Sequence, residues 1–113
     1  MKLLVVGSRS ITNFDLSPFV LPDVDTIISG GAKGVDALAE QYADLHHLSK
    51  YIIRPRYDLY GRAAPLKRNE QMVDIADAIL VVWDGFSKGT NHTIQYAKKI
   101  NKPVTVVQIQ SFL

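Results

Sequence analysis

The chain has 113 residues, a length that suits one domain, and it contains no cysteine, which excludes disulfide bonds and thiolate chemistry. Its 13 basic and 11 acidic residues give a net charge of +2, too balanced to indicate nucleic-acid binding by charge alone. The apolar run at residues 3–6 is too short for a signal peptide or a membrane span. We therefore expect one cytoplasmic domain, residues 1–113, without membrane contact.

Short runs rich in β-branched residues alternate with segments of helical period, a pattern typical of a parallel sheet with crossover helices. Strands are predicted at residues 3–6 and 26–29, and the connection between them has room only for a short helix near 13–20. Residues 34–46 form a predicted amphipathic helix, because apolar residues recur there every three or four positions. A third strand is predicted at 51–54.

The second half of the chain begins with a basic segment, residues 54–68, which is predicted to be mostly irregular. Loops of this length in a small domain are often functional. A helix is predicted over 65–77, where a proline suits the first turn. An almost wholly apolar strand at 78–83, a helix at 90–100 and a last strand at 103–109 complete the chain.

Strands this apolar are normally covered by helices on both faces. The predicted fold class is therefore α/β, a three-layer Rossmann-like sandwich with a five-stranded parallel sheet in the order 3-2-1-4-5. In such a sheet the order in which strands are added reverses between the first and fourth strands. Ligands bind beyond the carboxyl ends of the strands near that switch point.

Loops with glycine and hydroxyl side chains follow three of the predicted strands and converge on this edge. Glycine lets the backbone approach a ligand closely, and the N–H groups at the start of a following helix attract phosphate or carboxylate. The predicted ligand-binding residues of these loops are Gly7, Ser8 and Arg9 after the first strand, Ser29, Gly30, Gly31, Ala32, Lys33 and Gly34 after the second, and Asp84, Gly85, Ser87, Gly89 and Thr90 after the fourth.

Each of these features also has a purely structural interpretation. One glycine loop alone is more often a simple turn, and Ser87 is either a helix N-cap or a ligand donor. Asp36 either complements the helix dipole or orients Arg9 or Lys33. Trp83 is expected in the core, whereas Tyr60 is the better candidate for stacking on a base.

Known nucleotide and metal motifs do not match. The lysine of "GGAKGVD" precedes glycine rather than serine or threonine, which excludes the P-loop. Arg54 stands where an NAD-binding unit has an acidic residue for the ribose. His46 and His47 end a helix without other ligands nearby, so neither a metal site nor a cofactor is predicted.

Four ordered segments, "GSRS", "SGGAKGVDALAEQYA", "APLKRNEQMVDIADAILVVWDG" and "SKGTNHTIQYA", resemble the SLOG superfamily, in particular its small YspA-like branch. That superfamily includes DNA-processing protein A and the LOG-type phosphoribohydrolases. The resemblance implies a Rossmann-like domain that binds nucleotides or nucleotide-derived ligands through two glycine loops. Its motifs match Gly7, Ser8, Arg9, Gly30, Gly31, Gly34, Asp36, Arg68, Asn69, Gly85, Ser87, Gly89 and Thr90.

The chain departs from the LOG-type pattern at one important position. The catalytic glutamate of those hydrolases falls here on Thr93, so a carboxylate that would stabilise a glycosidic transition state is missing. Asp84 and Glu70 are the carboxylates that would have to replace it, and both are better interpreted as solvated residues.

Three functions follow from these observations. The first is binding of a phosphorylated nucleoside or NAD-derived metabolite, as a sensor or sequestering protein. The second is hydrolysis of a nucleotide N-glycosidic bond. The third is single-stranded DNA binding through residues 54–68, where Tyr57 and Tyr60 interleave with basic residues. A homo-oligomer is also expected, because much of the helix surface is apolar.

Overall fold

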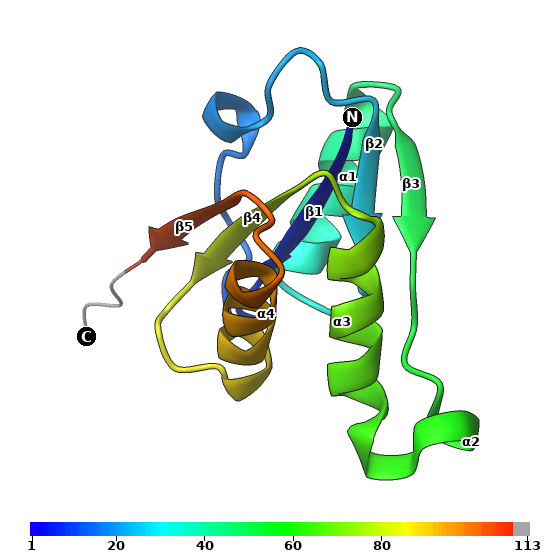
Figure 1. The fold of residues 1–113 in the computed structure, drawn as a ribbon. Coiled ribbons are helices and arrows are strands. Elements are labelled where there is room, and N and C mark those ends of the chain that lie inside the picture. The colour runs from blue at the N-terminus through cyan, green and yellow to red at the C-terminus, as the bar shows by residue number, and fades with distance from the viewer. Residues whose placement is uncertain (110–113) are drawn as a thin grey trace.

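The structure is a computed structural model that describes residues 1–109, and its centre is a five-stranded sheet in the order β3-β2-β1-β4-β5 (Figure 1). All neighbouring strands are parallel. The predicted fold class and strand order are confirmed. The strands are β1 (Lys2–Gly7), β2 (Thr26–Ser29), β3 (Ser49–Ile52), β4 (Ala78–Trp83) and β5 (Val104–Gln108).

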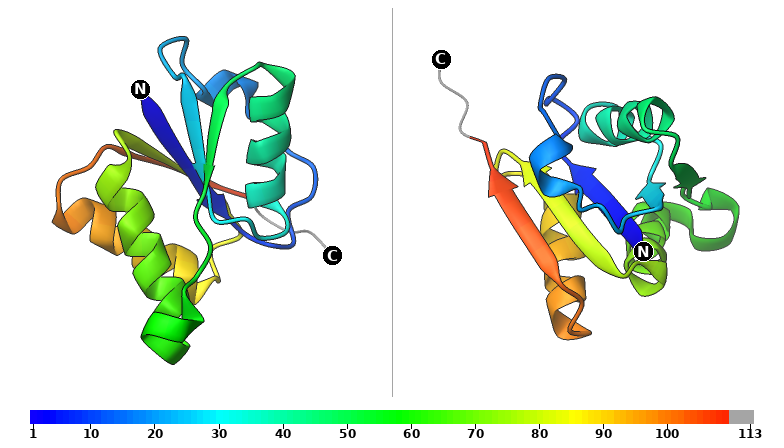
Figure 2. Two further views of the ribbon diagram at one scale, coloured as in Figure 1. Left: turned by 90° about the vertical axis from the view of Figure 1, so that its right-hand side faces the viewer. Right: turned by 90° about the horizontal axis from the view of Figure 1, so that it is seen from above.

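Helices cover both faces of the sheet, as Figure 2 shows when the sheet is viewed from its side. One face carries α1 (Val35–Leu45) and the β1–β2 connection, and the other carries α3 (Ala64–Ile75) and α4 (Lys88–Lys99). The four-residue helix α2 (Tyr57–Tyr60) lies beyond the end of β3 and leads through a 3-10 turn, Gly61–Ala63, into α3.

Three predicted segments differ from the structure. The short helix expected near 13–20 is a single 3-10 turn, Ser17–Phe19. Strand β3 starts before the predicted 51–54 because its register pairs Ser49 with Thr26 of β2. The basic segment, expected to be mostly irregular, contains the helix α2. Sequence analysis did not predict this helix because four residues are too few to produce a helical period.

The two sheet faces bury separate apolar clusters, and the central strands alternate between them. Leu3, Val5 and Leu80 face α1, whereas Leu4 and Val81 face α3 and α4. A strand buried on both faces is apolar at every position, which explains the continuous apolar runs of β1 and β4.

Strand β3, at one edge of the sheet, is the most exposed of the five strands. All four residues of this strand are exposed, including Tyr51 and Ile52. Within residues 1–109, no helix has both the length and the apolar character needed to cross a membrane.

Candidate ligand-binding site

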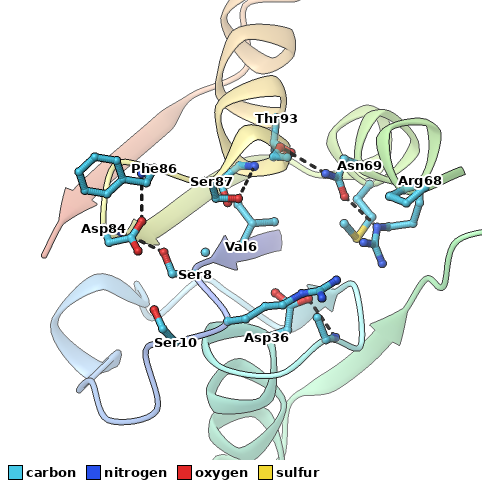
Figure 3. A pocket seen from close by; sticks show the side chains of 17 residues that line it. Val6, Ser8, Ser10, Asp36, Arg68, Asn69, Asp84, Phe86, Ser87 and Thr93 are labelled. Atoms are coloured by element: carbon cyan, nitrogen blue, oxygen red, sulfur yellow. Dashed lines mark hydrogen bonds between the residues drawn. The ribbon is translucent and has the colours of Figure 1, made fainter. Parts of the chain in front are cut away.

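A cavity of about 500 Å³ opens where the carboxyl ends of β1 and β4 meet the N-terminal ends of α3 and α4 (Figure 3). We call it the switch cavity, because the order in which successive strands are added to the sheet reverses between β1 and β4. It brings together eleven of the predicted ligand-binding residues: Gly7, Ser8, Arg9, Ala32, Asp36, Arg68, Asn69, Asp84, Ser87, Gly89 and Thr90.

Ser8 joins the loops at the floor of the switch cavity. Its hydroxyl oxygen accepts a hydrogen bond from the N–H of Asp84 (3.0 Å), and its own N–H donates to the carbonyl of Val82 (3.1 Å). The carbonyl of Ser8 accepts from the N–H of Val35 at the start of α1 (3.2 Å). The first loop is therefore held against β4 and α1 through backbone groups, as a preorganised site requires.

The N-terminus of α4 faces the switch cavity with two donors that the helix does not use. Ser87 is the N-cap of α4. Its hydroxyl oxygen accepts a hydrogen bond from the N–H of Thr90 (3.2 Å), and its carbonyl oxygen accepts one from the N–H of Asn91 (3.0 Å). The N–H groups of Lys88 and Gly89, in the first turn, have no acceptor within the helix. Together with the positive end of the helix dipole they favour an anion at this point.

Because Ser87 caps α4, we expect Ser87→Ala to lower the free energy of unfolding by about 1 kcal/mol, and Ser87→Gly by only a few tenths. Ser10 is a matched control, since it also lines the cavity but is exposed and its hydroxyl bonds to no described residue. Urea unfolding of the three variants, including Ser10→Ala, tests this. Equal stability of the Ser87→Ala and Ser10→Ala variants would contradict the capping role.

Arg68 on α3 connects three loops through its guanidinium group. Its Nη1 donates to the carbonyls of Gly30 (2.7 Å) and Ile53 (3.3 Å), and its Nε donates to the Asn69 side-chain oxygen (2.8 Å). Asn69 in turn donates to the carbonyl of Gly89 in α4 (3.4 Å). These bonds leave Nη2 without an acceptor among the described residues, so one end of the guanidinium remains available to a ligand.

In the loop between β2 and α1, two main-chain N–H groups donate to protein side chains. The N–H of Gly31 donates to the Ser29 hydroxyl (3.2 Å), and the N–H of Ala32 donates to the Asp36 carboxylate (3.2 Å). We expected the glycines of this loop to present such groups to an anion, and Asp36 to orient Arg9 or Lys33. The structure corrects the expectation for Asp36, whose carboxylate accepts the N–H of Ala32 in the place expected for an anion, and the N–H of Gly31 is engaged as well.

The glycines of this loop serve close packing. A Cβ on Gly30 would lie 2.7 Å from Arg68 Nη1 and 2.9 Å from Asp36 Oδ2. The absence of a side chain on Gly30 therefore lets both charged groups pack against its backbone.

Burial raises the pKa of the Asp36 carboxyl above its ordinary value, while the N–H of Ala32 and the Arg68 charge act in the opposite direction. Burial likewise lowers the pKa of Arg68, and Asp36 opposes that shift.

The raised pKa of Asp36 predicts a specific dependence of stability on pH. The folded chain binds this proton more tightly than the unfolded chain, so ionisation destabilises the fold as pH rises from the ordinary pKa of 3.8 through the raised value. We expect wild type to lose stability relative to Asp36→Asn over this range, since asparagine does not ionise. Urea unfolding of both proteins at a series of pH values measures the difference, and a difference that grows with pH in favour of wild type would contradict the prediction.

Six predicted ligand-binding residues do not line the switch cavity: Ser29, Gly30, Gly31, Lys33, Gly34 and Gly85. Lys33 is exposed beside it. Of the two carboxylates considered for catalysis, Asp84 lines the cavity, whereas Glu70 does not and instead contacts His92 (2.8 Å) on α4. Thr93 lines the cavity, and its hydroxyl donates to the carbonyl of Gly89 (3.0 Å).

Sequence reasoning missed five lining residues: Val6, Ser10, Pro65, Met72 and Phe86. Pro65 and Met72 were detectable, because with Arg68 and Asn69 they occupy positions i, i+3, i+4 and i+7 of one helix face. Phe86 had a weaker signal, an aromatic residue inside a glycine-containing loop.

The aromatic residues proposed for stacking lie elsewhere. Trp83 packs against the apolar cluster under α3 and α4, as expected of a core residue. Tyr60 lines a separate groove next to α2, together with Arg54, Arg56 and Leu59, and not the switch cavity. Within residues 1–109, no cluster of three or more His, Cys, Asp or Glu residues is arranged to hold a metal ion.

Comparison with known proteins gives two similar sequences. The gene 61 protein of Mycobacterium phage D29 is 31% identical over an alignment 120 positions long, which covers 91% of this chain and 93% of the phage protein. The uncharacterised SPbeta prophage-derived protein YoqJ of Bacillus subtilis is 35% identical over 63 residues, 55% of this chain but only 37% of YoqJ. No family model and no solved structure matches the chain.

Proposed function

The chain belongs to the same family as the gene 61 protein of Mycobacterium phage D29, and we propose that it binds a nucleotide or nucleotide-derived ligand in the switch cavity, as a sensor or sequestering protein. The observation that carries the proposal is the convergence of the α4 N-terminus, Arg9 and Arg68 on one cavity at the switch point of a parallel sheet. We propose further that the family is a branch of the SLOG superfamily, since each of the four motifs that carry the resemblance contributes residues to this cavity.

The size and position of the cavity support a small ligand. Its volume of about 500 Å³ lies within the usual range of ligand pockets, roughly 300–1,000 Å³. In doubly wound parallel sheets the carboxyl ends of the strands at the switch point are the usual binding place. A mononucleotide is a ligand of suitable size.

The charges favour one anionic group rather than two. The N–H groups of Lys88 and Gly89, the Arg68 Nη2 atom and the exposed Arg9 provide a positive region near α4. In the β2–α1 loop the N–H groups of Gly31 and Ala32 are engaged by protein atoms. One of these acceptors is the Asp36 carboxylate, which repels a second anion. We therefore propose that a single phosphate group binds between α4 and Arg68, with the ligand's hydroxyl groups toward Asp36.

Two charge-matched variants test the proposal. Arg9 and Lys33 are both exposed and both follow a strand, but only Arg9 lines the switch cavity. We expect isothermal titration calorimetry to give saturable binding of AMP to wild type, and much weaker binding of adenosine. Arg9→Gln is expected to weaken phosphate-ligand binding about tenfold, equivalent to about 1.4 kcal/mol, while Lys33→Gln leaves it unchanged.

Two results would contradict the proposal. A panel of mononucleotides, NAD, ADP-ribose and cyclic nucleotides that gave no saturable heat with wild type would remove its basis. Equal weakening by Arg9→Gln and Lys33→Gln would show that net charge, and not the cavity, determines binding.

Hydrolysis is the second candidate function, and the Asp84 carboxylate in the cavity wall is the observation that favours it. One of its oxygens already accepts the N–H of Phe86 (3.0 Å), and Thr93 stands where LOG-type hydrolases have their glutamate. We expect no free adenine when the protein is incubated with AMP and the products are separated by chromatography. Adenine release that is lost in Asp84→Asn would instead establish an enzyme.

Single-stranded DNA binding finds less support in the groove next to α2. Arg56 is engaged by both carboxylate oxygens of Asp58 (3.0 and 2.8 Å), and Arg54 donates to the carbonyl of Gly31 (3.4 Å). Oligonucleotide gel shifts at varied salt concentration test DNA binding.

Self-association remains a prediction, for which the exposed Tyr51 and Ile52 of β3 offer a surface. Analytical ultracentrifugation tests it.

A further inference from the structure

Phe86 is the most exposed large apolar residue of the described chain, and it lines the switch cavity. The exposed fraction of its side chain is 88%. The chain on either side of it is held in the fold: Ser87 caps α4, and Val82 is fully buried. A single exposed apolar side chain is ordinary on a protein surface. Its position in the wall of an otherwise polar part of the cavity, beside Ser8, Asp84 and Ser87, is what calls for a function.

The backbone that carries Phe86 is held on both sides while its ring is not packed. The N–H of Phe86 donates to the Asp84 carboxylate (3.0 Å), and the N–H of Asp84 donates to the Ser8 hydroxyl (3.0 Å). Gly85 adopts φ +93° and lies against Gln108 of β5, where a Cβ would come within 2.8 Å of the Gln108 side chain. The loop is therefore built to hold an aromatic ring at the cavity mouth without burying it.

The groups around the cavity are arranged in an order that suits a nucleotide. Figure 3 shows Arg68 and Asn69 on one side, Ser87 at the α4 N-terminus, and Phe86 with Asp84 on the opposite side. Asn69 links Arg68 to Gly89, so the proposed phosphate position lies between α3 and α4. A base joined to that phosphate through a ribose can extend toward the Phe86 side of the cavity, opposite Arg68.

We propose that Phe86 is the stacking platform for the base of the bound ligand, and that it distinguishes base-containing ligands from sugar phosphates. This inference rests on the proposed function, since it assumes that the phosphate binds at the α4 N-terminus. Aromatic rings stack on bases without requiring a particular base, because every base has a π-face. The selectivity expected from Phe86 is therefore for a planar ring, with base identity contributing less.

The test compares AMP with ribose 5-phosphate, which has the same phosphate and sugar but no base. We expect Phe86→Ala to weaken AMP binding about five- to one-hundredfold and to leave ribose 5-phosphate binding unchanged. Phe86→Leu, which keeps an apolar side chain without a π-system, is expected to resemble Phe86→Ala, and Phe86→Tyr to resemble wild type. The exposure of the ring makes all of these variants as stable as wild type, which thermal unfolding checks.

A spectroscopic measurement detects the stacking directly. Trp83 is the sole tryptophan of the chain, so Phe86→Trp adds one reporter at the cavity mouth. We expect AMP to quench its fluorescence and ribose 5-phosphate to leave it unchanged, with wild type measuring the Trp83 background. Quenching by both ligands, or by neither while AMP binds, would overturn the proposal.

The remaining outcomes separate this inference from the proposed function. If wild type binds neither ligand, the proposed function fails and Phe86 has no base to contact. If wild type binds AMP and Phe86→Ala binds it equally well, only the stacking role is refuted. If Phe86→Ala changes the sedimentation of the protein while AMP affinity is retained, Phe86 contacts a second copy of the chain instead.

Discussion

Gly34→Ala is expected to lower the free energy of unfolding by about 3–5 kcal/mol, whereas Gly61→Ala is expected to lower it by only about 1–2 kcal/mol. The two glycines have nearly the same backbone conformation, φ 73° and ψ −126° at Gly34 and φ 55° and ψ −129° at Gly61. Both substitutions therefore carry a similar conformational cost. A Cβ on Gly34 would in addition overlap the carbonyl oxygen of Ser8 and lie 2.5 Å from that of Arg9, whereas Gly61 has open space.

Urea unfolding of the two variants measures the difference, which reports the clash alone. The same clash would displace Ser8 and Arg9, so we also expect Gly34→Ala to bind AMP more weakly and Gly61→Ala to bind it normally. Equal losses of stability in the two variants would mean that the first loop moves away without cost, contrary to the rigid attachment of Ser8 to α1 and β4.

Arg68→Ala is expected to have the second large effect, a loss of about 2–4 kcal/mol of stability. It removes the donors to the carbonyls of Gly30 and Ile53 and leaves the buried Asp36 carboxylate without the neighbouring positive charge. Arg68→Lys keeps the charge but cannot reproduce the guanidinium fork, so an intermediate loss is expected.

A double-mutant cycle separates charge from hydrogen bonding. Asp36→Asn is expected to be more favourable in the Arg68→Ala chain than in wild type at neutral pH, because it then removes an uncompensated buried charge. Urea unfolding of the four proteins gives the coupling. Additive effects would show that Asp36 and Arg68 do not interact, and that Arg68 acts through its carbonyl acceptors alone.

Much of the candidate site was predictable because it follows from topology. The strand order of the sheet, read from alternating apolar runs and helical segments, places the ends of β1 and β4 side by side. Gly7, Ser8, Ser87 and Thr90 then converge without further information. The helix period also predicts that Arg68 and Asn69 point to the same side as Pro65 and Met72.

The β2–α1 loop shows why the remainder was not predictable. In the sequence, "SGGAKGVD" has the composition of an anion-binding loop, and the alternative use of its N–H groups depends on where Asp36 points. The buried carboxylate of Asp36 is tolerated because Arg68, 32 positions later in the numbering, packs against the same face of Gly30. No local pattern records a contact between residues so far apart.

The sequence by itself determined the fold class, the order of the strands and the edge of the sheet at which the candidate site lies, because period and apolar runs are local properties that topology rules convert into an architecture. Tertiary structure alone decided which donors remain free. In the second loop, Asp36 engages the N–H of Ala32 and Arg68 engages the carbonyl of Gly30. By contrast, the start of α4 keeps N–H groups that the helix does not use, and Phe86 keeps its ring uncovered. Those are properties of distances between elements, and only the packed chain defines them.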